Sequence, residues 1–134
     1  MYEYKATIRK IVDGDTCDVD IDLGFDCWLH NQRIRLYGVD TPECRTRNKQ
    51  EKAHGLLAKA YVQKALIVGE VYALRTREKG KFGRFLGELK TGKGAITKLL
   101  VKERLAVPYT GQNKKEIAAA QEANRIALIK EGKL

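Results

Sequence analysis

Residues 17–23 alternate strictly between apolar and acidic side chains, and no other feature of the sequence constrains the fold as strongly. Every second residue from Cys17 onward is apolar, and the residues between them are all aspartates. An alternation of period two places the two kinds of side chain on opposite faces of a β-strand. The segment is therefore predicted to be a half-buried strand, with Asp18, Asp20 and Asp22 on its solvent face.

The other hydrophobic patterns predict further strands and helices, and no repeat or linker divides the chain. We expect strands over residues 4–12, 17–23, 28–39, 71–77 and 85–89, and helices over 51–68, 95–105 and 114–130. In the first helix, the spacing predicts that one face carries Ala53, Leu57, Ala60, Tyr61, Ala65 and Val68. This order predicts an α+β fold, in which a five-stranded antiparallel OB-type barrel is accompanied by three α-helices. Barrel closure is inferred from the strand count, and residues 1–134 are expected to form a single domain.

The composition argues against a disordered chain and a membrane-spanning protein, and it favours a protein that binds a polyanion. With 43% hydrophobic residues the chain can form a core, which argues against disorder, and no stretch approaches about 18 uninterrupted apolar residues, which excludes a membrane span. The net charge of +9 points to a polyanionic partner, for which nucleic acid is the first candidate. The alternative is a basic surface that serves solubility alone.

The N-terminus and the cysteines concern the cellular setting. Residues 1–5 contain no apolar segment behind a basic start, so we expect a cytoplasmic protein, of a kind that would suit a phage or a bacterium. The three cysteines are too few and too scattered for a zinc site or a disulfide framework, and a reduced setting is the simplest interpretation. The alternative is a disulfide between Cys17 and Cys27, which flank a predicted hairpin.

Four carboxylates lie near the predicted ends of strands. Asp13 and Asp15 share one turn, and Asp40 and Glu43 flank the end of the third strand. If that strand pairs with an earlier one, the four converge, and such like charges raise one another's pKa unless a cation neutralises them. Hard oxygen donors favour Ca²⁺ or Mg²⁺ over zinc. The alternative is an ordinary Asp-Gly-Asp turn followed by a loop.

Two arginines complete the candidate set. Arg35 precedes Asp40 by five residues, and Arg84 closes a glycine- and lysine-rich loop. A planar guanidinium donates two parallel hydrogen bonds to a phosphate, so two arginines opposite a metal would stabilise a phosphodiester and its more highly charged transition state. Each arginine taken alone is equally consistent with a surface charge.

Three segments together resemble the motifs of the staphylococcal (thermonuclease-like) nuclease family. They are residues 12–16 (VDGDT), 35–43 (RLYGVDTPE) and 81–84 (KFGR). Their order and spacing fit the family, and the resemblance runs from about Ala6 to Ala127. It implies an OB barrel with three helices and Ca²⁺-dependent hydrolysis of DNA or RNA, with little sequence specificity and 3′-phosphate ends.

The resemblance also implies roles for individual residues. Asp15, Asp40 and the carbonyl of Thr41 are expected to bind Ca²⁺, with water completing the shell. Glu43 is expected to activate or position the attacking water, and Arg35 and Arg84 to bind phosphate. The residues expected to contact the substrate are Lys81, Phe82 and Tyr109; Phe82 replaces a tyrosine common in relatives, and Tyr109 either stacks on a base or caps the core.

The charge distribution is consistent with a site that cuts a polyanion. Residues 1–43 carry five basic and nine acidic side chains, whereas residues 44–134 carry 21 basic and eight acidic ones. The acid-rich part contains the expected metal site, and the basic part supplies a field that attracts nucleic acid. We expect a monomeric nuclease. The alternative is a catalytically inactive OB-type module that binds nucleic acid; a basic domain that binds an acidic protein would explain the charge but not the set of site residues.

Overall fold

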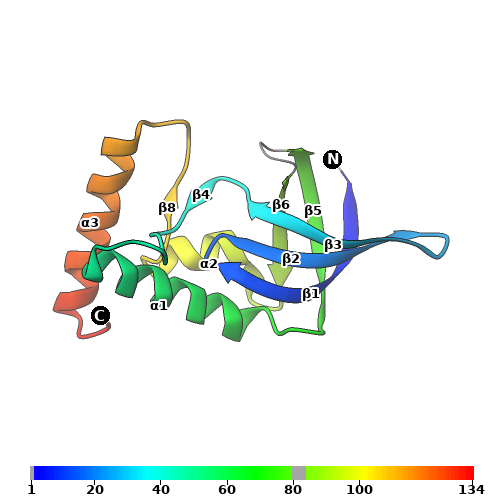
Figure 1. Ribbon diagram of the computed structural model, residues 1–134, viewed down its shortest axis with the longest axis horizontal. Helices are drawn as coiled ribbons and strands as arrows, with labels where there is room; N and C mark the ends of the chain where they lie inside the picture. The colour runs from blue at the N-terminus through cyan, green and yellow to red at the C-terminus, as the bar shows by residue number, and fades with distance from the viewer. Residues whose placement is uncertain (1, 80–83) are drawn as a thin grey trace.

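The computed structural model describes residues 2–79 and 84–134. Within this range the chain forms eight strands and three helices (Figure 1). Their bounds are β1 Glu3–Asp13, β2 Thr16–Gly24, β3 Cys27–Leu36, β4 Val39–Asp40, α1 Lys49–Ala65, β5 Val71–Lys79, β6 Phe85–Thr91, β7 Gly94–Ala95, α2 Ile96–Lys102, β8 Val107–Pro108 and α3 Lys114–Lys130.

Five strands close a barrel, which confirms the predicted architecture. The order around the sheet is β3-β2-β1-β5-β6, and a pairing between β3 and β6 closes the ring. That last pairing is parallel, from Ile34 opposite Phe85 to Leu36 opposite Gly87, so the sheet is mixed and not wholly antiparallel as expected. The reason is geometric: strand directions can alternate around a closed ring only if the number of strands is even.

The barrel interior is filled by alternate residues of its strands. Val19 and Ile8 are fully buried, and the predicted apolar face of β2 points into the core from Cys17 to Ile21, whereas Leu23 is exposed. Asp20 corrects the prediction, because it is buried where a solvent-facing aspartate was expected. Its carboxylate accepts hydrogen bonds from the backbone N–H of Asn31 (2.9 Å) and from the Arg9 guanidinium. These hydrogen bonds, above all that from Asn31, lower the pKa of Asp20 and keep the buried carboxyl ionised.

A glycine divides the strand that was predicted over residues 28–39. Gly38 adopts a φ of +80°, a left-handed conformation that interrupts an extended chain. The part before it is β3, and the part after it is β4, which pairs with β8 through Val39–Pro108 and Asp40–Val107. Asp40 is therefore positioned by a separate two-stranded sheet, next to the segment that leads to α3.

Helix α1 begins where Asn48 accepts hydrogen bonds from the N–H groups of Gln50 and Glu51. Its buried residues are His54, Gly55, Ala58 and Val62. The predicted apolar face was wrong in part, since Ala53, Ala60 and Val68 are exposed. The pattern of apolar residues gave the wrong buried face, because His54 and Gly55 are buried in this helix although neither is strongly hydrophobic.

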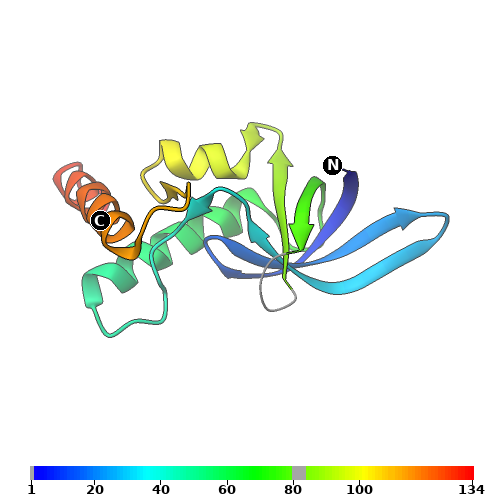
Figure 2. The ribbon, with the colours of Figure 1, turned by 90° about the horizontal axis from the view of Figure 1, so that it is seen from above.

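The barrel lies at one end of the molecule and α3 at the other, as both views show (Figures 1 and 2). The β2–β3 hairpin extends away from the helices. The three cysteines of the chain, Cys17, Cys27 and Cys44, are all free. Cys17 lies opposite Ile34, far along the hairpin from Cys27, so the two do not form a disulfide. Among the described residues, no helix is both long enough and apolar enough to span a membrane.

Candidate active site

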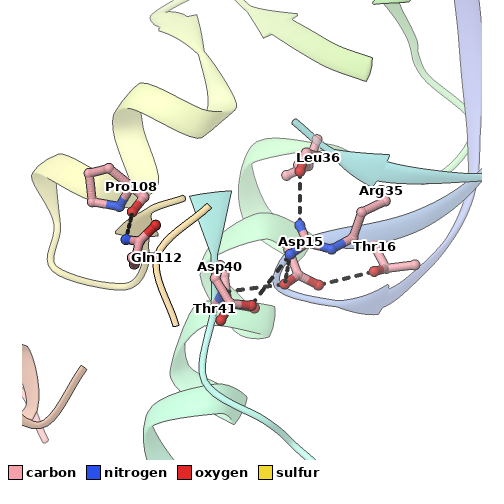
Figure 3. A network of polar contacts seen from close by, with 8 residues as sticks. All are labelled: Asp15, Thr16, Arg35, Leu36, Asp40, Thr41, Pro108 and Gln112. Carbon is pink, nitrogen blue, oxygen red and sulfur yellow. Dashed lines mark hydrogen bonds and ion pairs between the residues drawn. The ribbon is translucent and has the colours of Figure 1, made fainter. Parts of the chain in front are cut away.

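The turn between β1 and β2 holds Asp15 where three segments meet. Asp15 is buried, and its backbone carbonyl accepts a hydrogen bond from the N–H of Leu36, at the end of β3 (2.8 Å). Its carboxylate accepts one from the hydroxyl of Thr16 (3.0 Å) and one from the backbone N–H of Thr41 (3.3 Å) (Figure 3). The carboxylate is thus fixed between the barrel and the residue that follows β4.

Arg35 joins Asp15 to Asp40. The side chain extends from β3, and its Nη2 atom lies 3.4 Å from Oδ2 of Asp15 and 3.4 Å from Oδ1 of Asp40 (Figure 3). The Nη1 atom donates to the carbonyl of Leu36 (2.8 Å). Three residues that the sequence analysis assigned to one site therefore meet around a single guanidinium.

Two carboxyl groups of the site, those of Asp40 and Glu43, have raised pKa values. Burial raises the pKa of Asp40, the charge of Asp15 raises it further, and the Arg35 guanidinium opposes both effects. Partial burial also raises the pKa of Glu43, followed by the charges of Asp15, Asp13, Asp40 and Glu51. The arrangement is electrostatically unfavourable for anions and therefore favours an added cation.

A cavity of about 800 Å³ opens beside this cluster. Its walls include Arg35, Asp40, Arg84 and Tyr109. Arg84, which is distant in the sequence, is thus brought to the same hollow as Arg35. Tyr109 is exposed and does not cap the core; its backbone N–H donates to the carbonyl of Gly38 (2.8 Å), which fixes its position in the wall. Lys81 and Phe82 lie outside the described residues.

Glu43 lies at the exposed end of the segment that follows β4, and the backbone beneath it rests directly on α1. A Cβ atom on Gly55 would lie 2.5 Å from the carbonyl oxygen of Glu43 and 2.7 Å from that of Pro42. A Cβ atom on Gly14 would lie 2.9 Å from Cβ of Ala58 and 3.1 Å from Cγ2 of Thr41. The two glycines let α1 approach both segments of the site.

The sequence analysis did not identify these contacts. Gly14 was interpreted only as part of a turn, and Gly55 was not considered. A glycine in the interior of a helix lowers the stability of that helix by about 1 kcal/mol relative to alanine. A glycine at position 55 is therefore a signal in the sequence that another segment packs closely against the helix there.

The donor atoms at the site fit a hard cation. Among the described residues, no group of three or more His, Cys, Asp or Glu side chains is placed to hold a metal ion. Two carboxylates do converge, and Oδ2 of Asp15 and Oδ1 of Asp40 already face one cationic atom, Nη2 of Arg35. Because Ca²⁺ accepts carboxylate, carbonyl and water oxygens in irregular shells, this pair suits Ca²⁺ with water completing the shell.

A protein-family comparison agrees with this geometry. The model described as "Staphylococcal nuclease homologue" matches residues 33–131, which is most of the chain. The chain belongs to the staphylococcal nuclease family. The matched range includes Arg35, Asp40, Glu43 and Arg84 and begins after Asp15, which the structure places 3.4 Å from Arg35.

Three curated proteins are identical to this chain at about a third of the aligned residues. A protein named thermonuclease from Staphylococcus intermedius is 36% identical over 100 residues, 74% of this chain and 56% of that protein. A second thermonuclease, from Staphylococcus hyicus, is 33% identical over 105 residues, 78% of this chain and 59% of that protein. An uncharacterized protein of Methanocaldococcus jannaschii is 33% identical over 102 residues, 62% of this chain and 46% of that protein. The chain spans a little over half the length of the two thermonucleases it matches.

Proposed function

We propose that this chain is a Ca²⁺-dependent nuclease that hydrolyses the phosphodiester bonds of DNA, RNA or both, with little sequence specificity, and leaves 3′-phosphate ends. The observation that carries the proposal is the position of Arg35, which contacts Asp15 and Asp40 and shares a cavity with Arg84. Two guanidinium groups at one cavity, one of them in contact with two carboxylates, suit a phosphodiester and a divalent cation. The names of the two relatives, both thermonucleases, support the same reaction.

Each residue of the site has a role in this proposal. Arg35 and Arg84 bind the phosphate oxygens and stabilise the additional charge of the transition state. Glu43 accepts a hydrogen bond from the attacking water and orients it, or removes its proton. Asp15, Asp40 and the carbonyl of Thr41 hold Ca²⁺, which when bound supplies Lewis-acid stabilisation of the phosphoryl oxygens.

Contacts to the substrate's backbone dominate the proposed binding mode. Tyr109 offers an exposed ring in the wall of the cavity, on which any base can stack. We assign the same class of contact to Phe82, and a phosphate contact to Lys81. Stacking and phosphate contacts do not read base edges, so the proposed enzyme tolerates many sequences.

The alternative function is binding of nucleic acid without cleavage, since OB-type barrels bind strands in many proteins that do not cut them. One feature counts against it: Asp15, Asp40 and Glu43 repel a polyanion. A module that only binds has no use for these acids, two of which lie 3.4 Å from the guanidinium of Arg35.

A digestion assay tests the proposed function. The protein is incubated with end-labelled single-stranded DNA, duplex DNA and RNA, in Ca²⁺, in Mg²⁺ or in a chelator, and the product ends are identified. We expect cleavage in Ca²⁺, none in the chelator, and products with 3′-phosphate ends. Binding without cleavage in Ca²⁺ would favour the alternative, and 5′-phosphate ends or activity in the chelator would contradict the proposed reaction.

A further inference from the structure

A second cavity, of about 390 Å³, lies next to the one that holds the site residues. We call it the α2 cavity, because Lys98 and Lys102 of α2 line it, and we call the larger one the site cavity. Tyr37, Gly38 and Val39 line both cavities. The two hollows are therefore adjacent and are separated only by the short segment between β3 and β4, beside which α2 lies (Figure 2).

The segment between the cavities forms a low and rigid ridge. Gly38 carries no side chain, and no atom of the described residues lies within 4 Å of the position that its Cβ would take. The backbone is held from two sides, since the N–H of Tyr37 donates to the carbonyl of Gly87 (2.9 Å) and the carbonyl of Gly38 accepts from Tyr109 (2.8 Å). A chain that leaves the site cavity can cross this ridge without displacing a side chain at Gly38.

Tyr37 presents an aromatic ring on the ridge. The residue is 44% exposed, and the guanidinium of Arg77 lies over its ring, 4.8 Å from the centroid. Because Arg77 lies over one face, the ring is held in place while the rest of it remains accessible. A planar base can stack on such a ring whatever its sequence.

The α2 cavity is basic. Lys98 and Lys102 are four residues apart, so they lie on the same side of the helix, and both are exposed. Neither forms an ion pair within the described part of the chain, and no acidic residue is among the described residues that line the cavity. Two lysines that share one hollow with a ring and lack acidic partners suit successive phosphates of a flexible polyanion.

We propose that the α2 cavity binds the strand of a single-stranded nucleic acid where it continues out of the site cavity, with a base on Tyr37 and backbone phosphates at Lys98 and Lys102. This inference rests on the proposed function, since it supposes that the site cavity holds a phosphodiester. It adds that the substrate is a strand of several nucleotides, and that residues outside the reacting centre determine this preference.

The test compares two probes of different length. A fluorescein-labelled thymidine dinucleotide fits the site cavity alone, whereas a thymidine strand of about 12 nucleotides, within the range that OB-type domains bind, reaches both cavities. Dissociation constants are measured by fluorescence anisotropy in Ca²⁺, in a Glu43→Gln background in which cleavage is expected to be slow. The double variant Lys98→Gln/Lys102→Gln is compared with Lys64→Gln/Lys130→Gln, which changes the net charge equally on the last turns of α1 and α3.

We expect the α2 double variant to bind the long strand up to about 25-fold more weakly at about 0.1 M salt, and to lower the slope of log Kd against log salt by about 1.4, since each lost phosphate contact contributes about 0.7 to the slope for single strands. Binding of the dinucleotide should change less than about twofold, and the control double variant should leave the difference between the two probes unchanged. Tyr37→Ala should also weaken binding of the long strand, and Tyr37→Phe should restore it.

Three outcomes would overturn the inference. If the α2 double variant weakens both probes equally, the lysines supply only a general field. If it behaves like the control while the parent binds and cuts the long strand, the α2 cavity does not take part and the proposed function stands. If the parent binds neither probe, the proposed function and this inference both fail.

Discussion

A Cβ atom on Gly55 would lie 2.5 Å from the backbone carbonyl oxygen of Glu43, which is closer than real Cβ atoms come to other atoms. Gly55 is a buried residue of α1, so the helix rests directly on the backbone that carries the proposed water-orienting carboxylate. The helix gives up about 1 kcal/mol of intrinsic stability by having glycine there instead of alanine. The close approach therefore fixes the position of Glu43 relative to the barrel.

Gly55→Ala should lower the cleavage rate at least about tenfold, because the added methyl group must push the Glu43 backbone away from its position, and small misplacements of a catalytic group are costly. We also expect a loss of about 1–3 kcal/mol in the free energy of unfolding, from overpacking. Steady-state cleavage and urea unfolding measure the two effects. Gly92→Ala is the control, since its Cβ would meet nothing within 4 Å. Equal activity of the two variants would show that Gly55 does not position Glu43.

Arg35→Gln should change metal binding and catalysis in opposite directions. Without the guanidinium, Asp15 and Asp40 lose a competing positive charge 3.4 Å away, and Ca²⁺ affinity should rise on the order of tenfold. The cleavage rate should fall on the order of 10²- to 10³-fold, because one transition-state donor is lost. Calorimetric titration with Ca²⁺ and a cleavage assay measure the two.

The control for that experiment is Arg33→Gln, which removes the same charge from the same strand. Arg33 is paired with Asp18 on the exposed face of β3 and contacts neither carboxylate of the site. Arg33→Gln should leave the Ca²⁺ affinity and the cleavage rate nearly unchanged. Weaker Ca²⁺ binding by Arg35→Gln would mean that Asp15 and Asp40 are not the ligands.

The sequence predicted those parts of the molecule that local patterns determine. Strict alternation identified β2 and its buried face, and the strand count led to the closed barrel. The strands and the barrel depend on backbone periodicity and on turn residues, both of which can be read directly from the chain. Asp15, Arg35 and Asp40 were grouped by the resemblance of residues 12–16 and 35–43 to the nuclease family, and the structure joins them through one guanidinium.

What escaped prediction depends on contacts between distant segments. The buried carboxylate of Asp20 was assigned to solvent because nothing near it in the sequence reveals Arg9 and Asn31 as its partners. The buried face of α1 was misplaced because Gly55 has no side chain to count as apolar, although its backbone packs against that of Glu43. The break at Gly38 was missed although the sequence carries a signal of it, because the apolar Leu36 and Val39 are three residues apart and cannot share one face of a continuous strand.

Stability should fall as the pH drops below about 6.5 through the buried imidazole of His54. Its Nε2 lies 2.9 Å from the carbonyl oxygen of Arg104, which can only accept, so Nε2 carries the proton and Nδ1 has no partner among the described residues. Burial lowers the pKa of His54 below its usual 6.5, and the charge of Arg125 adds to the effect, although the Arg104 hydrogen bond and the charge of Glu122 oppose it. The unfolded chain therefore binds a proton first as the pH falls.

The contribution of His54 to stability is thus complete at a pH above the pKa that this residue has in the unfolded chain. It is lost as the pH falls toward the lower pKa of the folded protein, at up to about 1.4 kcal/mol per pH unit. Urea unfolding between about pH 5 and pH 8 measures it. The stability difference between the parent and His54→Gln should shrink as the pH falls. A difference independent of pH would contradict the assignment.

Tyr109→Ala should weaken substrate binding by about 1–3 kcal/mol, roughly 5- to 150-fold, if the ring stacks on a base in the site cavity. Tyr109→Phe keeps the ring and should bind as the parent does. Tyr2→Ala, which removes an exposed ring just before β1 and outside the cavity, serves as the control. A loss in Tyr109→Phe equal to that in Tyr109→Ala would assign the contact to the hydroxyl group and not to stacking.

The most direct measurement is the rate at which Glu43→Gln cleaves labelled single-stranded DNA in Ca²⁺, compared with the parent and with Glu51→Gln. Glu51 also raises the pKa of Glu43 by its charge, so its loss controls for a change in the local field. We predict that Glu43→Gln binds DNA as the parent does and cleaves it about 10²- to 10⁴-fold more slowly, while Glu51→Gln stays within about threefold of the parent. Cleavage by Glu43→Gln at the rate of the parent, or no cleavage by the parent in Ca²⁺, would contradict the proposed nuclease mechanism.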